Sequence, residues 1–147
     1  MTAAVLAPAS RPTEVIRRLH EVSPSEDLDL VLEHISPGEV LFSTHARRMG
    51  QHPGVITHGG VCTTLLDFAL SSAVQSLLAP GRSYRPVDFA VTLGGVSRPL
   101  EGRLEATAHA VRRGSGILVA SGSVRGGDGV LHATGRLVAL ATEGAEA

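Results

Sequence analysis

Residues 58–67 read His58-Gly-Gly-Val-Cys-Thr-Thr-Leu-Leu-Asp67, and no Pro or further Gly follows until Pro80-Gly81. Apolar residues recur every three or four positions along this stretch, which predicts a helix that continues to about Leu78. The helix is apolar over most of its circumference, so we expect it in the core. One narrow stripe is different because it carries small and polar residues at helical spacing: Gly60, Thr63, Thr64, Asp67 and Ser71.

Two features of this stretch point to chemistry. Asp67 is a lone carboxylate on a mostly apolar helix, and burying such a charge without a partner is costly. Gly59 and Gly60 have no Cβ, and they stand where the first N–H groups of a helix are unpaired and its dipole is positive. That place suits the oxygen of a thioester or ester carbonyl, which gains negative charge under attack.

The spacing of these residues favours a dimer. Asp67 lies roughly 12 Å beyond Gly59, at about 1.5 Å of rise per residue. The two residues of one chain are therefore poorly placed to act on the same carbonyl. Two antiparallel helices related by a two-fold axis would bring each Asp67 to the other chain's Gly59.

The composition limits the class of protein. The 147 residues fit one domain, 43% apolar but only 3% aromatic, and 17 Gly with 8 Pro favour many turns and short strands. A net charge of −1 gives no general electrostatic case for nucleic acid or a membrane surface. All 13 basic residues are Arg, which removes the lysine of a P-loop or a Schiff base, and a single Cys excludes an intrachain disulfide. Neither a secretory signal nor a membrane span is evident, so we expect a cytoplasmic protein.

Alternating apolar residues predict six strands around the central helix. A turn at Pro37-Gly38 joins the first two, Gly94-Gly95 indicates a bulge or a close approach to the helix, and small residues on the strands allow the sheet to wrap closely around it. We expect an N-terminal extension over 1–27 with a short helix, a domain over 28–140, and a loose tail over 141–147. The expected strands cover 28–33, 40–46, 87–97, 103–112, 116–125 and 130–140.

These residues resemble a known family. His-Gly-Gly, six residues and then Asp at the head of a long helix is similar to the PaaI-type hotdog-fold acyl-CoA thioesterases of the 4-hydroxybenzoyl-CoA thioesterase-like superfamily. The resemblance extends over roughly 28–140 and includes four further segments: 36–38, 97–102, 111–114 and 129–135. It implies an α+β hotdog fold, in which an antiparallel sheet of about six strands wraps around one helix. It also implies hydrolysis of an acyl- or aryl-CoA thioester by a homodimer with shared sites or a homotetramer.

The resemblance assigns catalytic roles to three residues and steric clearance to a fourth. It implies that Asp67 is the nucleophile or the general base that activates water. The Gly59 N–H of the other subunit is the expected oxyanion donor, and Gly60 leaves room for the substrate. His58 shapes the loop or contacts the carbonyl. Read from the sequence alone, Asp67 is equally a helix carboxylate that pairs with an Arg or is capped by Thr63 or Thr64, and Gly59 is equally a turn glycine at a helix entrance.

Further substrate-binding residues follow from the same resemblance. The family often has Asn or Gln in the loop before the motif; this sequence has no Asn, so Gln51 or His52 takes that position. Ser71 matches a hydroxyl that orients water in some relatives, although a small residue packed on a partner helix is as good an interpretation. Ser83 is a weaker candidate of the same kind.

Basic residues near a turn complete the predicted site. Arg112 and Arg113 correspond to positions where relatives bind the phosphates of CoA, and neighbouring residues on a strand point to opposite faces, so at most one does this. Surface charge is the alternative for both. We expect no metal and no cofactor other than the CoA thioester substrate, because the histidines have no ligand spacing.

Two other functions stay open at this point. His52-Pro53-Gly54 resembles the His and Pro-Gly of hotdog enoyl-CoA hydratases and dehydratases, although the Asp/Glu-His pairing of that chemistry is not evident. A non-catalytic acyl-CoA-binding module is the third possibility, against which the carboxylate at Asp67 argues. The acyl group, and CoA as against a carrier protein, do not follow from the sequence.

Overall fold

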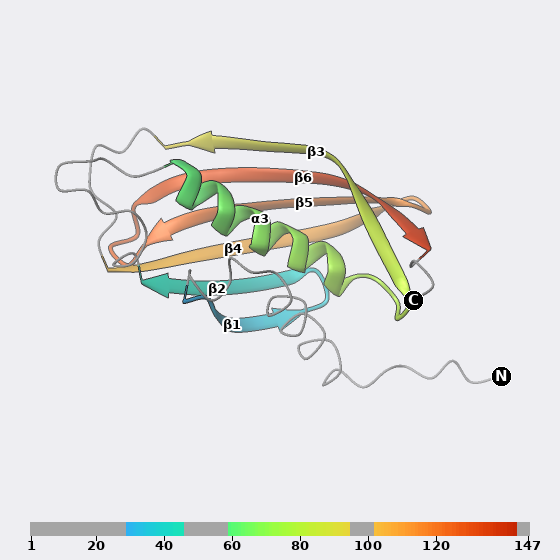
Figure 1. Cartoon of the computed structure of the whole chain (residues 1–147), viewed down its shortest axis with the longest axis horizontal. Coiled ribbons are helices and arrows are strands. Elements are labelled where there is room, and N and C mark those ends of the chain that lie inside the picture. The colour runs from blue at the N-terminus through green and yellow to red at the C-terminus, as the bar shows by residue number, and fades with distance from the viewer. Residues whose placement is uncertain (1–28, 46–58, 95–101, 144–147) are drawn as a thin grey trace.

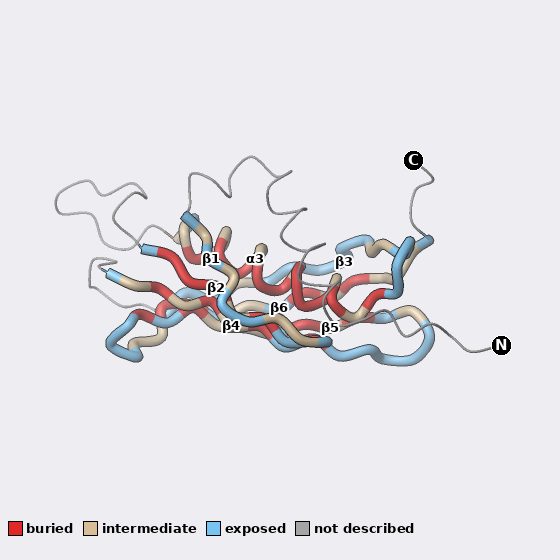
Figure 2. The backbone as a smooth tube through the Cα atoms, turned by 90° about the horizontal axis from the view of Figure 1, so that it is seen from below, coloured by how far each residue is buried: buried red, intermediate tan, exposed pale blue. Residues whose placement is uncertain are grey.

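The computed structural model describes residues 29–45, 59–94 and 102–143. One antiparallel sheet of six strands curves around one helix, and the helix lies across a single face of the sheet (Figure 1). Buried positions are concentrated where the helix meets the sheet (Figure 2). The predicted hotdog architecture is therefore confirmed. The short N-terminal helix expected within 1–27 lies outside the described residues.

The helix, α3, spans Gly59–Ser76, so it begins at the glycine pair and ends two residues before the predicted position. Its core side packs against the sheet, and the polar stripe lies on the opposite side, with Gly60 and Asp67 exposed and the other stripe residues partly exposed. Asp67 is thus not buried in the single chain. The helix residues that are fully buried are Cys62, Leu65, Leu66, Ala69, Leu70, Ala73 and Val74.

The strands follow the order β1-β2-β4-β5-β6-β3 across the sheet. The strand that follows the helix is therefore placed beside the last strand of the chain, at one edge. Residues 104, 106, 108 and 110 of β4 are all buried on the face that packs against α3, which we call the helix-side face, as the sequence predicted. The bounds are β1 Val31–Ser36, β2 Glu39–His45, β3 Arg82–Leu93, β4 Arg103–Arg113, β5 Ile117–Gly126 and β6 Leu131–Glu143.

Strands β3 and β6 differ most from the prediction. β3 begins at Arg82 rather than near Val87, because its first residues pair with the end of β6, with Tyr84 opposite Ala141. That pairing also carries β6 to Glu143, so the first three residues of the expected loose tail belong to a strand. Pro86 is tolerated since β3 is an edge strand, and the irregularity in this strand lies at Pro86/Asp88 rather than at Gly94.

Small residues let the helix approach the sheet closely. Gly122 on β5 lies opposite Gly135 on β6. A Cβ built on Gly135 would lie 3.1 Å from Leu66 Cδ1 and 3.2 Å from Leu70 Cδ1, and one on Gly122 would lie 3.3 Å from Leu70 Cδ2. The two leucines of α3 therefore fill the depression left by two missing side chains.

The first hairpin is anchored to the end of α3. Gly38, in the β1–β2 turn, has φ +81° and donates its N–H to Ser76 Oγ at 2.8 Å. Its carbonyl accepts the N–H of Ala110 at 2.7 Å. The predicted turn at Pro37-Gly38 thus also fixes the C-terminal end of the helix against β4. No helix among the described residues combines the length and hydrophobicity that crossing a membrane requires.

Candidate active site

The start of α3 is open at Gly60 and covered on one side at Gly59. Gly60 is exposed, and Gly59 is partly exposed. The hydroxyls of Thr63 and Thr64 each donate to a carbonyl four residues earlier, those of Gly59 and Gly60, at 2.8 Å. In both bonds the threonine hydroxyl is the donor and a backbone carbonyl is the acceptor, so neither bond involves a backbone N–H. These two bonds therefore leave untouched the N–H groups of the first turn, which have no carbonyl four residues earlier within the helix and are the groups that could donate to an oxyanion.

Asp67 lies on the exposed side of α3, two turns beyond Gly59. The hydroxyl of Ser71 donates to its Oδ1 at 3.3 Å. Among the described residues no Arg forms an ion pair with Asp67, so the interpretation of a carboxylate paired with Arg gains no support. Asp67 and Ser71 form a pair on the surface, and the hydroxyl bonds to one of the two carboxylate oxygens.

Gly59 and Asp67 are not brought together within one chain. Both belong to one regular helix, so the rise of about 1.5 Å per residue keeps them roughly 12 Å apart. The expectation that one chain is an incomplete site therefore stands as a prediction, with Asp67 exposed and Gly59 partly exposed on the same helix.

The remaining predicted residues lie at the other end of the helix. Ser83 is the second residue of β3, opposite Thr142, whereas Leu93 ends that strand beside Gly59. At about 3.3 Å per strand residue, Ser83 is more than 30 Å along β3 from Leu93. Arg112 donates through Nη2 to the carbonyl of Leu77 at 3.3 Å, just beyond the end of α3.

Arg112 and Arg113 are both exposed, and the alternation of β4 sends them to opposite faces as predicted. Arg112 is on the helix-side face, where it contacts the end of α3, and Arg113 is on the other. Only Arg112 is therefore on the face that carries Asp67. His58, Gln51 and His52 lie outside the described residues.

Cys62 is a packing residue. It is fully buried in the core, and burial raises the pKa of its thiol, which keeps the sulfur neutral and unreactive. In the described part of the chain no three His, Cys, Asp or Glu side chains gather as a metal site. The chemistry available on the exposed side of α3 is thus a carboxylate, a hydroxyl and the N–H groups of a helix start.

Leu93 contacts Gly59, and it is not among the residues that the sequence pattern points to. A Cβ built on Gly59 would lie 2.8 Å from Leu93 Cδ1. The contact depends on β3 pairing with β6 at the edge of the sheet, which places the end of β3 beside the start of α3. The sequence contains no local pattern that reports a contact between positions 34 residues apart.

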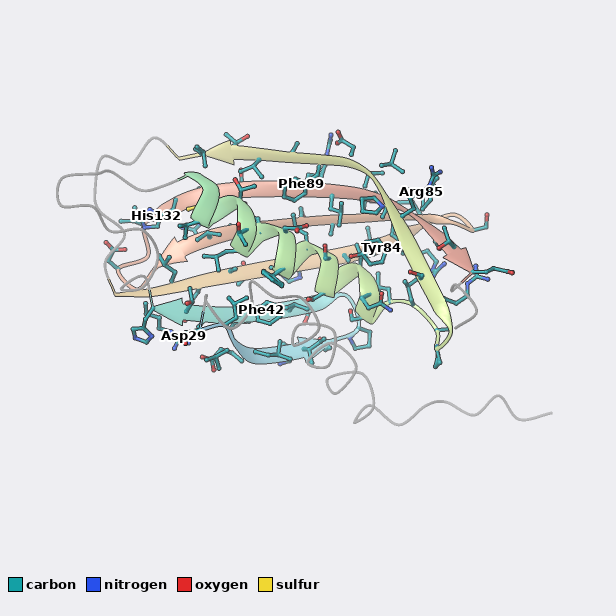
Figure 3. The ribbon with its side chains drawn as sticks, viewed as in Figure 1. Asp29, Phe42, Tyr84, Arg85, Phe89 and His132 are labelled. Carbon is teal, nitrogen blue, oxygen red and sulfur yellow. The ribbon has the colours of Figure 1, made fainter. Side chains whose placement is uncertain are left out.

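The edge strand β3 carries an exposed apolar surface. Three of the six large exposed apolar residues in the described part of the chain are on this strand: Val87, Phe89 and Leu93. Phe89 can be followed on β3 in Figure 3. By contrast, the opposite edge strand β1 is half as long and mostly polar at its exposed positions.

Comparison with known proteins identifies the fold. No protein-family model matches the chain, and no curated protein matches it in sequence. Among solved structures, a thioesterase family protein from Silicibacter pomeroyi superposes with a TM-score of 0.78 at 23% identity, covering 91% of this chain and 99% of that one. A thioesterase from Haemophilus influenzae gives 0.75 at 20% identity, covering 89% and 90%.

A third neighbour is a hypothetical thioesterase from Streptococcus pneumoniae solved with coenzyme A, with a TM-score of 0.74, 17% identity and 89% and 99% coverage. All three similarities extend over nearly the whole of each chain. The sheet order and the single central helix are thus shared with proteins of the thioesterase superfamily. The chain has the hotdog fold of that superfamily.

Proposed function

We propose that the protein is an acyl-CoA thioesterase that hydrolyses an acyl- or aryl-CoA thioester to the free acid and CoA. The observation that carries the proposal is the exposed side of α3, where a glycine pair opens the helix and, among the described residues, the Asp67 carboxylate bonds to Ser71 and to no Arg. The fold shared with thioesterases supports the reaction class. The neighbour solved with coenzyme A supports CoA as the carrier.

The proposed chemistry divides between two subunits. The thioester carbonyl oxygen accepts the N–H of Gly59 from one subunit, and Asp67 of the other lies beside the carbonyl carbon. Asp67 either removes a proton from the attacking water or attacks first and forms an anhydride that water then hydrolyses. In both routes the C–S bond breaks, CoA leaves as the thiolate and takes up a proton, and the hydroxyl of Ser71 holds the Asp67 carboxylate in place.

The edge strand supplies the dimer contact in this proposal. An edge strand leaves backbone N–H and C=O groups unpaired, and β3 is long and carries the exposed apolar side chains of Val87, Phe89 and Leu93. Two β3 strands paired antiparallel would join two sheets and place the helices antiparallel. The start of α3, at Gly59, would then lie beside the start of the partner's β3, at Ser83. Ser83 and Arg112 of one subunit could in this way contact substrate bound at Gly59 of the other. A homotetramer formed from two such dimers is the larger assembly that we expect.

The reaction is tested by the change Asp67→Asn. We expect turnover of the preferred acyl-CoA to fall by about 1,000-fold or more, because the neutral amide neither accepts a proton nor attacks. Thermal melting should be unchanged, since the residue is exposed. Free-thiol release from short, long and aromatic acyl-CoAs gives the rate, and an enoyl-CoA absorbance assay reports any hydratase. A folded Asp67→Asn protein with normal turnover would refute the mechanism, and tight CoA-ester binding without turnover by the wild type would favour a binding module.

Shared sites are tested by mixing two inactive subunits. Gly59→Pro removes the oxyanion N–H and also displaces the flexible Leu93 side chain, which lies 2.8 Å from a Cβ built on Gly59, and Asp67→Asn removes the carboxylate. Each homodimer should therefore be inactive, and both variants are first shown to be folded by thermal melting. Co-expression should restore about a quarter of wild-type activity, because about half of the dimers are mixed and each of these has one intact site of two. A mixture that stays as inactive as its components would show that each site belongs to one chain.

A further inference from the structure

Leu93 covers one flank of the proposed oxyanion position. The Cδ1, Cδ2 and Cγ atoms of Leu93 are the three heavy atoms nearest to a Cβ built on Gly59, at 2.8, 3.7 and 3.9 Å. The isobutyl group of Leu93 therefore occupies the space that a side chain at position 59 would take. Any group whose oxygen accepts the Gly59 N–H, at about 3 Å, lies within reach of this side chain.

The backbone of Leu93 is fixed although its side chain is half exposed. Leu93 pairs with Ala133, which is fully buried, and the next residue, Gly94, donates its N–H to the carbonyl of His132 at 2.7 Å. Gly94 itself is closely packed, because a Cβ there would lie 2.6 Å from the carbonyl oxygen of Leu131. The side chain of Leu93 is nevertheless 54% exposed. It is thus a partly exposed apolar side chain on a fixed backbone, in contact with Gly59.

A row of apolar side chains continues from Leu93 along the helix-side face of β3, in which Leu93 and Phe89 are exposed and Val91 between them is partly buried against the core. Phe89 lies opposite the buried Leu137, Val91 lies opposite Gly135 beneath the helix leucines, and Leu93 lies opposite Ala133, so all three point to that face. Successive members are about 6.6 Å apart, and none of them has a polar atom in its side chain. Leu93, at one end of the row, contacts Gly59, and Val91 and Phe89 lie progressively farther from it along β3.

We propose that Leu93 is a specificity-determining residue that limits the width of the site at the acyl carbon next to the thioester carbonyl. This inference rests on the proposed thioesterase function. A carbonyl at Gly59 has its neighbouring carbon against the Leu93 side chain, so an unbranched acyl chain passes along β3, whereas a branch at that carbon meets the Leu93 methyl groups. The preferred substrate class is thus acyl-CoA that is apolar and unbranched next to the carbonyl.

The test compares isomers that differ only at that carbon. Straight-chain acyl-CoAs and their 2-methyl-branched isomers of equal carbon number are hydrolysed by wild type, Leu93→Ala and Leu93→Phe, with short, medium and long pairs. We expect wild type to prefer the straight isomer in kcat/KM. Leu93→Ala should reduce that preference by about tenfold, because one methyl group in an apolar pocket changes discrimination by that order, and Leu93→Phe should increase it.

Val31→Ala is the matched control, since Val31 is an aliphatic residue of equal exposure, 53%, on the opposite edge strand. Its isomer preference should equal that of wild type. A preference that stays within about twofold of wild type in both Leu93 variants would overturn the inference while the thioesterase function stands. A wild-type preference for the branched isomer, or an equal shift in Val31→Ala, would also overturn it. Wild type that releases CoA from no isomer would overturn the proposed function and this inference with it.

Discussion

The two sides of α3 are built from different kinds of residue, because one side packs in the core and the other faces solvent. The side against the sheet consists of leucines, alanines and a cysteine that are fully buried, and it fits a depression made by Gly122 and Gly135. The outer side carries Gly60, Asp67 and Ser71 and contacts little of its own chain. One side of the helix therefore packs against the sheet and stabilises the core, and the other side carries polar groups that could contact a substrate. Substitutions on the sheet side should lower stability and leave turnover close to wild type, whereas substitutions on the outer side should lower turnover and leave stability unchanged.

The largest effect on stability is expected from Leu70→Ala. Leu70 is fully buried and its two methyl groups lie over Gly122 and Gly135, so truncation leaves a cavity that the sheet backbone cannot fill. We expect a loss of about 2–5 kcal/mol in the free energy of unfolding, measured by urea denaturation, with kcat of the folded protein close to wild type.

A second change shows whether this fit causes the loss. Gly135→Ala should recover part of the lost stability in the Leu70→Ala background, because the atoms nearest to its new Cβ are leucine methyl groups. Gly122→Ala should not, because its Cβ would collide with the carbonyl oxygen of Thr107. A loss below about 1 kcal/mol in Leu70→Ala would contradict the described packing.

A smaller effect, on activity only, is expected from Ser71→Ala on the outer side. The change removes the hydroxyl that donates to Asp67 Oδ1. We expect kcat/KM to fall by about tenfold, which corresponds to about 1.4 kcal/mol, with an unchanged melting temperature. Ser72→Ala is the matched control, because Ser72 is the next residue but is buried on the sheet side. If Ser72→Ala lowers turnover as much as Ser71→Ala, the two sides are not separate in function.

The smallest effect is expected away from both sides of the helix, at Glu33. The hydroxyl of Ser43 and then Arg103, whose Nη2 lies 2.8 Å from Oε1, lower the pKa of the Glu33 carboxyl. A lowered pKa in the folded state adds stability above the ordinary glutamate value of about 4.3, and that stability is lost as the pH falls through the folded pKa.

Glu33→Gln should therefore be slightly less stable than wild type at pH 7, and the difference should shrink as the pH is lowered towards 3. Melting temperatures across this range, with kcat as a second readout, provide the measurement. If the stability difference between wild type and Glu33→Gln instead grows as the pH falls, the ionised Glu33 carboxylate is not the cause of that difference.

The sequence predicted the elements of this fold better than their edges. The helix pattern and the alternation of β4 follow from burial on one face, and both were correct. The start of β3 was wrong because Arg82 to Pro86 has the composition of a turn, whereas its pairing partners lie at the end of β6. Such pairing is a property of the whole sheet and leaves no local pattern.

The site was predictable where it depends on one element. The stripe of Gly60, Asp67 and Ser71 was read from helical spacing, and the structure places all three away from the sheet. The exposure of Asp67 was not anticipated, because an apolar helix suggests burial on every side. The contact of Leu93 with Gly59 could not be predicted from the sequence either. It depends on the crossover connection that places β3 beside β6, which is distant from it along the chain.

That crossover also sets the order in which the chain can fold during synthesis. β3 has no partner until β6 exists, and the two are joined by pairs such as Leu93 with Ala133, forty residues apart. At about 5–20 residues per second, Phe89 and Leu93 wait on the order of 2–8 s after they are made before their strand can be completed. During that interval an apolar strand with two unpaired edges is available to other nascent chains, so chaperone occupancy should be highest before β6 emerges.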